Sequence, residues 1–374
     1  MAGEISVCHV VNVVRDTSMP GDLATTQATL DEIETVGILA WKGVEPFRNM
    51  DSIEIHNLDV SDSSYRVTPT QYREARSVLE EYDIVHTHHN HSGFYAKLIA
   101  NRLGKPIVVT EHNNHGGFTR KGRIANGLTN ALADEVACVS ESVRDSFAWW
   151  ENRLVSNSSV SVVENGVDLE RLESARETDW SIHDVADIHP DAIVVGSAGM
   201  LTEQKAHDVL IDAVDRANAN YDRPIELVIS GDGPLRSELE RQISLAKHSS
   251  RLHLLGFLEE RRQVYKMMDE IDIYAMPSRW EGFCVAALEA LAVENACVFS
   301  DIPEFRSPFE DVASFHEVDN PEHCSEKIVS LVKNDDYRNH IAREAKSLVT
   351  SEYTLEKTAR RYFDKYLDSS SIRV

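Results

Sequence analysis

Short apolar runs alternate with longer amphipathic segments along most of the chain. In the first half the runs are ISVCHVVNV, DIVHTH, PIVVTEH, EVACVS and VSVVENG, and helix-like segments between them include QYREARSVLEEY, FYAKLIANRLG and RIANGLTNALA. Runs this short, rich in β-branched residues and apolar throughout, are typical of parallel strands covered on both faces. The alternation therefore predicts an α/β fold with a parallel sheet.

The second half repeats this rhythm in AIVVGSAG, IELVISGDG, RLHLLG, IDIYAMPS and ACVFSD, and beyond about residue 320 the pattern is helical only. A chain of 374 residues exceeds what one core usually serves. We predict two doubly wound, Rossmann-like domains facing each other across a cleft, at residues 1–168 and 191–353. The polar, acid-rich stretch 169–190 is expected to connect them, and 354–374 to form a helix that packs back on the first domain. Ligands of such folds bind at the carboxyl ends of the strands.

The net charge of −24 changes the range of plausible partners. Phosphate contacts need a basic face, so nucleic acid is excluded as a main partner and broad docking on anionic lipid is disfavoured. A dispersed acid surplus, with Arg commoner than Lys, is typical of salt-tolerant surfaces. A haloarchaeal source is one interpretation, and an ordinary acidic soluble protein is the other.

The cysteines and the apolar runs bear on the compartment. Scattered cysteines without a C-x-x-C pair predict buried, reduced thiols and neither disulfides nor a zinc site. They are Cys8, Cys138, Cys284, Cys297 and Cys324. No apolar run approaches the roughly 18 residues of a membrane span, and the N-terminus is interpreted as a first strand, not a signal peptide. We expect a cytoplasmic protein, with at most weak peripheral association at the cytoplasmic face of the membrane.

A set of ordered motifs carries a resemblance to a known family. The pieces are VVENGVD, GMLTEQKAHDVLIDAV, LVISGDGP, LHLLGFL, IDIYAMPSRWEGFCVAALEALA and FSDIPEF, with looser matches at DIVHTHH, VVTEH and ADEVACVSE. In this order they resemble the retaining glycosyltransferases of family 4, which have the GT-B fold. The resemblance implies transfer of a sugar from a nucleotide-activated donor to an acceptor hydroxyl, without a cofactor or a bound metal.

The segment RWEGFCVAALEAL carries two acids in apolar surroundings. The resemblance places Glu281 on the hydroxyls of the donor sugar, Glu289 on the ribose, and the amides of Phe283, Cys284 and Val285 near the diphosphate. These roles are physically apt, because a carboxylate accepts hydrogen bonds from a diol and a helix N-terminus attracts phosphate. The alternative is an amphipathic helix with Glu289 facing solvent. We disfavour it because a lone carboxylate in such an apolar segment would be costly to bury.

Lys205, in TEQKAHD, follows a predicted strand. The resemblance gives it the role of neutralising the departing diphosphate, where a cation stabilises charge that develops in the transition state. Two departures accompany it. The family usually has an Arg five residues earlier, where this chain has Met200, and a Gly-x-Pro where this chain has Glu294-Asn295-Ala296.

Several glycine-containing loops complete the expected donor site. The loop with Gly231 and Gly233 lets the backbone approach a ligand, although a plain strand-to-helix turn explains it equally well. The resemblance places Gly256 and Phe257 near the base, and the amide of Gly21, in MPGDLATTQ, near the diphosphate.

Histidines and a basic segment stand out in the first half. The resemblance places His112, in VVTEH, against the donor sugar, whereas the simpler interpretation is a strand-end histidine. HTHHNH (86–91) suggests a metal site, but no carboxylate or Cys pattern completes it, so ordinary strand-end histidines are favoured. FTRKGR (118–123) is interpreted as a solvated loop, with contact to an anionic acceptor such as a lipid phosphate as the alternative.

The motifs together predict a retaining, hexosyl-type glycosyltransferase that acts on a glycan, lipid-linked or polysaccharide acceptor. Two other classes stay open. A non-catalytic glycosyltransferase-like binding or scaffold protein is suggested by Met200 and the Glu294 loop, and a GT-B nucleotide-sugar epimerase is the less favoured alternative.

Overall fold

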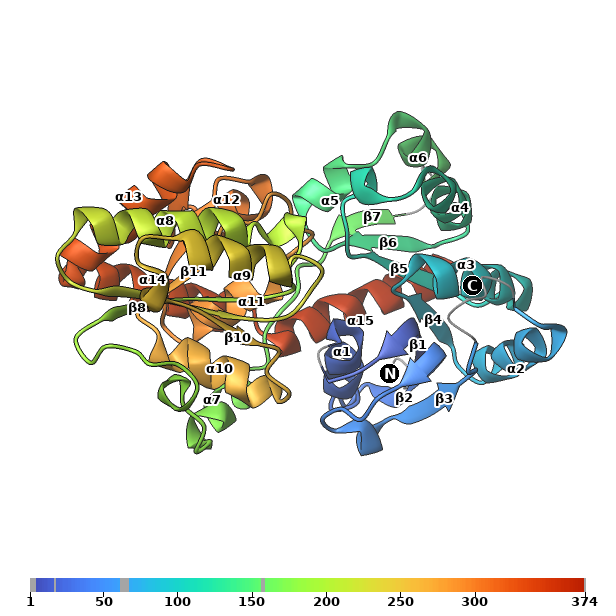
Figure 1. The fold of residues 1–374 in the computed structure, drawn as a ribbon. Coiled ribbons are helices and arrows are strands. Elements are labelled where there is room, and N and C mark those ends of the chain that lie inside the picture. Colours follow the sequence, from blue (N-terminus) through green and yellow to red (C-terminus); the bar gives the residue numbers. More distant parts are fainter. Residues whose placement is uncertain (1–4, 17, 61–66, 156–158, 373–374) are drawn as a thin grey trace. The chain divides into compact units, whose positions relative to one another are not determined.

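The computed structural model describes residues 5–16, 18–60, 67–155 and 159–372. The chain divides into two compact units, the first formed by 1–166 with 355–374 and the second by 167–354. Each unit is built on its own parallel sheet, and the ribbon of each is drawn in Figure 1. The predicted fold class of two α/β domains with parallel sheets is confirmed.

The first unit contains a seven-stranded parallel sheet of order β3-β2-β1-β4-β5-β6-β7. Its strands are β1 (Ile5–Val14), β2 (Ile33–Val44), β3 (Glu54–Asn57), β4 (Ile84–Thr87), β5 (Ile107–Glu111), β6 (Glu135–Cys138) and β7 (Ser159–Val162). The sequence pattern anticipated all of these except β2 and β3. The strand order reverses between β1 and β4, so the loops that follow these two strands diverge there.

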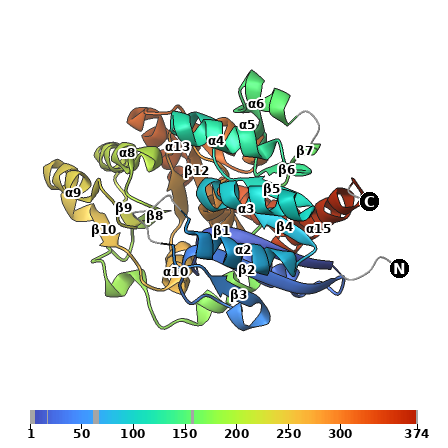
Figure 2. The same cartoon turned by 90° about the vertical axis from the view of Figure 1, so that its right-hand side faces the viewer.

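Helices cover both faces of this sheet. They are α1 (Met19–Gln27), α2 (Pro69–Glu80), α3 (Asn90–Leu103), α4 (Arg120–Asn130), α5 (Glu141–Asp145), α6 (Trp149–Leu154) and α15 (Leu355–Ile372), with 3₁₀ turns η1 (Met50–Ser52) and η2 (His115–Gly117). Helix α1 packs on α15. Helix α3 packs between α2 and α4 (Figure 2). The last helix of the chain thus completes the core of the first unit, where Ala359, Tyr362 and Tyr366 lie among Val7, Ile38 and their neighbours.

The second unit has a six-stranded parallel sheet of order β10-β9-β8-β11-β12-β13. Its strands are β8 (Ile193–Ala198), β9 (Ile225–Ser230), β10 (Leu252–Gly256), β11 (Ile273–Met276), β12 (Ala296–Ser300) and β13 (Ser314–His316). The short edge strand β13 was not anticipated. Here the order reverses between β8 and β11, the point where ligands of doubly wound folds bind.

The helices of the second unit flank this sheet. They are α7 (Leu169–Ser174), α8 (His207–Asn220), α9 (Arg236–Leu245), α10 (Arg261–Glu270), α11 (Val285–Ala292), α12 (Pro303–Phe309), α13 (Pro321–Lys333) and α14 (Asp335–Glu352), with 3₁₀ turns η3 (Ala175–Glu177), η4 (Ile182–Asp184), η5 (Glu203–Lys205) and η6 (Ser249–Arg251). The stretch 169–190, expected as a connection, groups with this unit, and its α7 and η3 pack against α10.

The five cysteines are buried free thiols, as predicted. Among the described residues, none of the helices has the length and apolar character needed to cross a bilayer.

Gly231 lies where the loops after β8 and β9 meet. Its φ of 144° lies outside the range that L-residues commonly adopt, and an added Cβ would sit 1.9 Å from the Gly199 carbonyl oxygen. Gly43, in β2, has nothing within 4 Å of the same added atom. We predict that Gly231→Ala lowers the free energy of unfolding by about 3 kcal/mol, through backbone strain and overpacking. Urea denaturation followed by circular dichroism measures it.

Gly43→Ala is the matched control and should change that free energy by less than about 0.5 kcal/mol. Equal effects of the two substitutions would show that close packing of the two loops does not limit stability.

Candidate functional site

The site of the second unit is organised around an ion pair at the point where the strand order reverses. Lys205 ends η5 in the loop after β8, and Glu281 lies in the loop after β11. The two strands are neighbours in the sheet, so the loops at their carboxyl ends leave from the same edge. Lys205 Nζ lies 2.7 Å from Glu281 Oε1. Two residues predicted from separate motifs are therefore in direct contact.

Neutral donors hold the Glu281 carboxylate from two sides. Ser278 Oγ donates to Oε1 at 2.6 Å, and Gln204 Nε2 donates to Oε2 at 3.2 Å. The Glu281 side chain is 6 % exposed and the Lys205 side chain 17 %. A carboxylate this buried needs such partners, because desolvation penalises its charged form. The arrangement keeps the carboxylate fixed at the edge of the sheet.

The ammonium of Lys205 is stabilised in its charged form. Burial by itself lowers the pKa of Lys205, but Cys284 and the Glu281 carboxylate outweigh burial, and the net pKa is raised. Burial also raises the pKa of the Cys284 thiol to about 11, so this thiol is neutral near neutral pH. Glu281 is therefore the partner that keeps Lys205 charged under those conditions.

Helix α11 begins beside this pair. Its N-cap is Cys284, which makes no side-chain capping hydrogen bond, and Cys284 Sγ lies 3.8 Å from Lys205 Nζ. Phe283 is buried, with its ring 6.2 Å from that of Tyr353. The first turn, from Val285, carries the amides and partial positive charge expected of a helix N-terminus. The predicted cluster of Phe283, Cys284 and Val285 therefore adjoins the Lys205–Glu281 pair.

Glu289, in α11, is buried but not alone. Its Oε1 pairs with the Arg261 guanidinium and accepts a hydrogen bond of 2.9 Å from Tyr265 Oη. The disfavoured alternative, a Glu289 that faces solvent, does not hold, and α10 supplies two partners for the carboxylate at i and i+4 on one face. This pairing explains the burial of Glu289 without a ligand and leaves the ribose contact a prediction.

The glycines of the second unit are explained by contacts between loops. A Cβ on Gly233 would lie 2.6 Å from the Leu201 carbonyl oxygen. The amide of Gly231 donates to the Gly256 carbonyl at 2.8 Å. Gly256 itself has a φ of 77°, in the left-handed region. Of the two explanations of these loops, the strand-to-helix turn therefore accounts for the glycines by itself.

Two apolar side chains at this edge stay open to solvent. Met200, after β8, is 64 % exposed, and Phe257, after β10, is 67 % exposed. The exposed Phe257 ring is available to stack on a planar group. The second departure from the family pattern has a structural explanation, since Glu294 adopts a φ of 72° and Asn295 Nδ2 donates to the Met268 carbonyl at 2.7 Å.

In the first unit, His112 follows β5 and belongs to a group of histidines. Its Nε2 lies 3.2 Å from Nδ1 of His88, the residue after β4. His9, His86 and His88 each bring one nitrogen to within 4.8 Å of the others, a spacing that suits a metal ion. These nitrogens already take part in side-chain hydrogen bonds, however, such as 2.9 Å between His9 Nδ1 and His88 Nε2. A metal there would have to displace those bonds.

Gly21 lies in the first turn of α1. Its amide donates to the Ser18 carbonyl at 2.9 Å, and an added Cβ would lie 3.0 Å from Val14. Close packing of α1 on β1 therefore explains this glycine, and the predicted contact of its amide with the diphosphate gains no geometric support.

The basic segment 118–123 divides into two parts. Arg123 pairs with the buried Glu151, which also accepts from His115 Nδ1 at 2.9 Å. Arg120 and Lys121 are exposed in the first turn of α4, which Thr119 caps. Arg123 thus stabilises the packing of α4 against α6, and only the other two cations face solvent.

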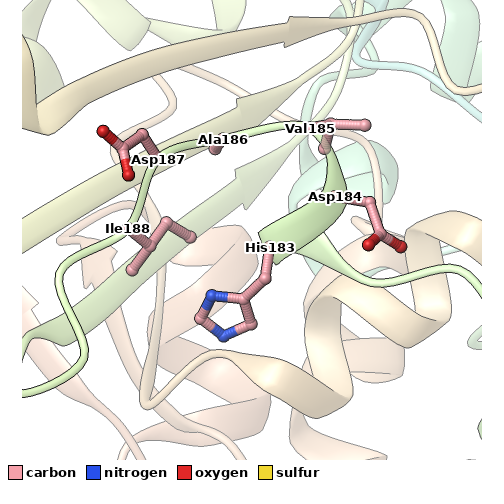
Figure 3. Close-up of a pocket in the computed structure, with 6 residues that line it drawn as sticks. All are labelled: His183, Asp184, Val185, Ala186, Asp187 and Ile188. Carbon is pink, nitrogen blue, oxygen red and sulfur yellow. The ribbon is translucent and has the colours of Figure 1, made fainter.

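A surface hollow in the second unit differs from this site. Six consecutive residues from His183 to Ile188 line it, and their side chains do not converge on a common centre (Figure 3). A binding site usually brings polar groups together from several elements. We assign no role to this hollow.

Sequence reasoning missed the polar partners of the two glutamates. Ser278 stands in the PSRWEG turn, three residues before Glu281, and Gln204 precedes Lys205. Arg261 and Tyr265 share a face of α10, as their i, i+4 spacing could have indicated. No pattern in a single sequence links α10 to α11, so the pairing of Arg261 and Tyr265 with Glu289 could not be predicted.

Comparison with known proteins identifies the class. The family model "Glycosyl transferases group 1" matches residues 178–348, and "Glycosyltransferase Family 4" matches residues 35–171. The chain resembles the crystal structure of Anabaena Alr3699/HepE in complex with UDP and glucose, with a TM-score of 0.77 at 15 % identity over 97 % of this chain and 99 % of that one. The fold is that of the GT-B glycosyltransferases. The chain belongs to glycosyltransferase family 4.

Two relatives from Escherichia coli illustrate the family. One is the O-antigen biosynthesis glycosyltransferase WclY, 24 % identical over 86 % of this chain and 92 % of the relative. The other is UDP-Gal:alpha-D-GlcNAc-diphosphoundecaprenol alpha-1,3-galactosyltransferase, 26 % identical over 77 % of this chain and 76 % of the relative.

The Lys205–Glu281 pair makes a prediction about stability. Lys205→Met leaves the buried Glu281 carboxylate without its cation, so the free energy of unfolding should fall by about 2 kcal/mol. Adding Glu281→Gln to Lys205→Met removes the stranded charge and should restore most of that loss. Chemical denaturation of wild type, both single variants and the double variant gives the four unfolding free energies of a double-mutant cycle. Strictly additive effects of the two substitutions would contradict the pairing.

Proposed function

We propose that the protein is a retaining glycosyltransferase that moves a hexosyl group from a nucleotide-diphosphate sugar to a lipid-linked acceptor. The observation that carries this proposal is the charged Lys205, held by Glu281 beside the start of α11. Family membership supports the reaction class, and relatives named for UDP and for a diphosphoundecaprenol substrate support the choice of donor and acceptor.

In the proposed reaction the bond between the anomeric carbon and the diphosphate oxygen breaks, and its electron pair leaves with the diphosphate. Lys205 and the amides at Phe283, Cys284 and Val285 stabilise that charge, which gives the reaction a source of positive charge without a bound metal. The acceptor oxygen bonds to the anomeric carbon on the face that the diphosphate leaves. The acceptor proton passes to the departing phosphate oxygen, so the configuration is retained.

The remaining site residues position the donor. Glu281 accepts hydrogen bonds from the sugar hydroxyls. Glu289 accepts hydrogen bonds from the ribose hydroxyls, and Arg261 fixes the Glu289 carboxylate. Phe257 packs against the base, and His112 contacts the sugar. Met200, where the family usually has an Arg, leaves Lys205 as the main side-chain cation of the diphosphate site.

Turnover tests the proposal. Lys205→Met and Glu281→Gln should each lower kcat by roughly 100-fold or more, because each removes a contact with charge or hydroxyls that the transition state needs. Release of nucleoside diphosphate is measured with a panel of nucleotide-diphosphate sugars and undecaprenyl-diphosphate-linked acceptors, and product stereochemistry by NMR of the anomeric proton.

Lys247→Met, at an exposed lysine after α9, is the matched control and should leave kcat unchanged. Turnover that survives Lys205→Met would contradict the leaving-group account. Binding of donors by wild type without any release would favour the non-catalytic alternative, and an inverted product would refute retention.

An unusual charge distribution supports an anionic acceptor on the first unit. Although the chain carries a net charge of −24, residues 84–133 contain a single acid, Glu111, which is buried. Exposed cations of this stretch include Arg102, Arg120 and Lys121. Positive potential is therefore concentrated on α3 and α4, which pack against each other (Figure 2).

Apolar side chains accompany these cations. Ile124 and Leu128, one and two turns after Arg120 on α4, are exposed, and so is Trp149 on the neighbouring α6, at 81 %. We call Arg120, Lys121, Ile124, Leu128 and Trp149 the α4 face. Exposed apolar groups next to cations suit the interface of an anionic bilayer. We propose that the α4 face contacts this surface, where a lipid-linked acceptor resides.

Vesicle binding tests the α4 face. Arg120→Ser with Lys121→Ser should weaken binding to vesicles containing phosphatidylglycerol by roughly 30-fold, at about 1 kcal/mol for each cation. Cosedimentation at low ionic strength measures the partition coefficient, since salt screens this attraction. Arg241→Ser with Lys247→Ser, exposed cations of the second unit, is the matched control. Equal binding by the two double variants would refute the α4 face.

A further inference from the structure

A chain of side-chain hydrogen bonds runs through the interior of the first unit and ends at His112. Seven links connect its eight members end to end, at 3.2, 2.9, 2.8, 3.0, 2.7, 2.7 and 2.8 Å. The members, in order, are His112, His88, His9, Gln27, Tyr366, His86, Thr110 and Tyr362. All are buried except His112, which is partly exposed.

The hydrogen-bond chain joins elements that are far apart in sequence. His9 lies in β1 and Gln27 ends α1, while His86 and Thr110 come from β4 and β5. Tyr362 and Tyr366 lie one turn apart on α15, the last helix. The elements around the β1–β4 reversal are therefore linked to the loop that carries His112.

The amide of Gln27 sets the direction of the first three links. Its Nε2 donates to Tyr366 Oη, so its Oε1, which can only accept, faces His9 Nε2. His9 Nε2 must therefore carry the proton. Burial lowers the pKa of His9 to about 4, so the ring is neutral and its Nδ1 is unprotonated. That nitrogen accepts from Nε2–H of His88, a second buried neutral ring.

The same reasoning determines which ring nitrogen of His112 carries the proton. Since His88 carries its proton on Nε2, its Nδ1 must accept, and the donor is Nε2–H of His112. Burial lowers the pKa of His112 to about 3, so this ring is neutral and has one proton. The proton is used toward His88. The Nδ1 of His112 is left as a lone pair, and within the described part of the chain it makes no hydrogen bond.

In the second half of the hydrogen-bond chain the donors point in the same direction. Tyr366 lies 2.7 Å from His86 Nδ1 but 3.3 Å from Gln27 Oε1, so its proton goes to the histidine. His86 Nε2–H then donates to Thr110 Oγ1, and Thr110 donates to Tyr362 Oη. Every donor points from His112 toward Tyr362. Aligned hydrogen bonds polarise and strengthen one another, so reversing one link requires reversing all.

We propose that this hydrogen-bond chain is a positioning device that holds His112 in the Nε2–H tautomer. Gln27 is the residue that sets the direction of its donors. His112 then presents only an acceptor, so it recognises a group of the donor that carries a proton, such as a sugar hydroxyl. The hydroxyl contact rests on the proposed function, whereas the tautomer does not. Gln27 acts on the ligand through two other side chains and has no contact with it.

Nitrogen-15 NMR of the full chain, labelled at histidine, tests the proposal, because protonated and unprotonated ring nitrogens resonate far apart. The His112 signals are assigned by their loss in His112→Gln. We expect a protonated Nε2 and an unprotonated Nδ1 in the protein without ligand. A protonated Nδ1 in wild type would mean that the chain runs in the opposite direction and would overturn the inference.

Two variants separate direction-setting from mere packing. Gln27→Met removes the acceptor of His9, so the His112 tautomers should become mixed and the KM for the donor should rise about five-fold, the equivalent of one hydrogen bond. Tyr362→Phe is the matched control, since it removes a buried hydroxyl from the far end of the chain. It should leave the His112 tautomer unchanged even if stability falls. An unchanged tautomer in Gln27→Met would contradict the role of Gln27.

Titration with UDP-glucose and with UDP-galactose separates this inference from the proposed function. Hydrogen bonding of a sugar hydroxyl should shift the Nδ1 signal of His112. The Nε2–H tautomer with no shift from either sugar nucleotide would refute the sugar contact and leave the tautomer inference standing. The opposite tautomer together with measurable turnover would refute the inference alone.

Discussion

The electrostatic pairing of Lys205 with Glu281 is the constraint on which the donor site depends. A parallel sheet whose order reverses between β8 and β11 sends two loops away from the same edge, and a buried ion pair joins them again. A buried carboxylate requires its cation, and that cation stays charged because the carboxylate is there. The pair also adjoins the start of α11, so the fold places the Lys205 ammonium beside the partial positive charge of a helix N-terminus.

The first unit has a different requirement, which is to give its buried polar side chains hydrogen-bond partners. Its sheet edge buries three histidines, a glutamine and two tyrosines, each of which would be costly without a partner. The hydrogen-bonded chain satisfies them through a single direction of donors, and α15 supplies two of its members. The acid-poor surface of α3 and α4 stands apart from this interior chemistry. A hydrogen-bonded polar interior and a cationic exterior thus occur in the same unit.

The strand runs and the motif order predicted the two α/β sheets, and they singled out Lys205 and Glu281, which the structure brings into contact. Periodicity could not reveal β13, a three-residue edge strand, nor the grouping of 169–190 with the second unit, because both depend on packing. The pairing of Glu289 with Arg261 could not be predicted, because the two residues are remote in sequence. HTHHNH was interpreted as ordinary strand-end histidines, and the roles of Gln27 and Tyr366 could not be predicted because both residues lie on helices remote in sequence.

Calorimetric titration of the full chain with UDP measures the central claim, that Lys205 binds the diphosphate, without requiring turnover or an acceptor. The account predicts that Lys205→Met raises the Kd by at least about ten-fold, equivalent to about 1.4 kcal/mol, while UMP, which lacks the second phosphate, loses less affinity. Lys247→Met should bind UDP as wild type does. An unchanged Kd for UDP in Lys205→Met would contradict the account.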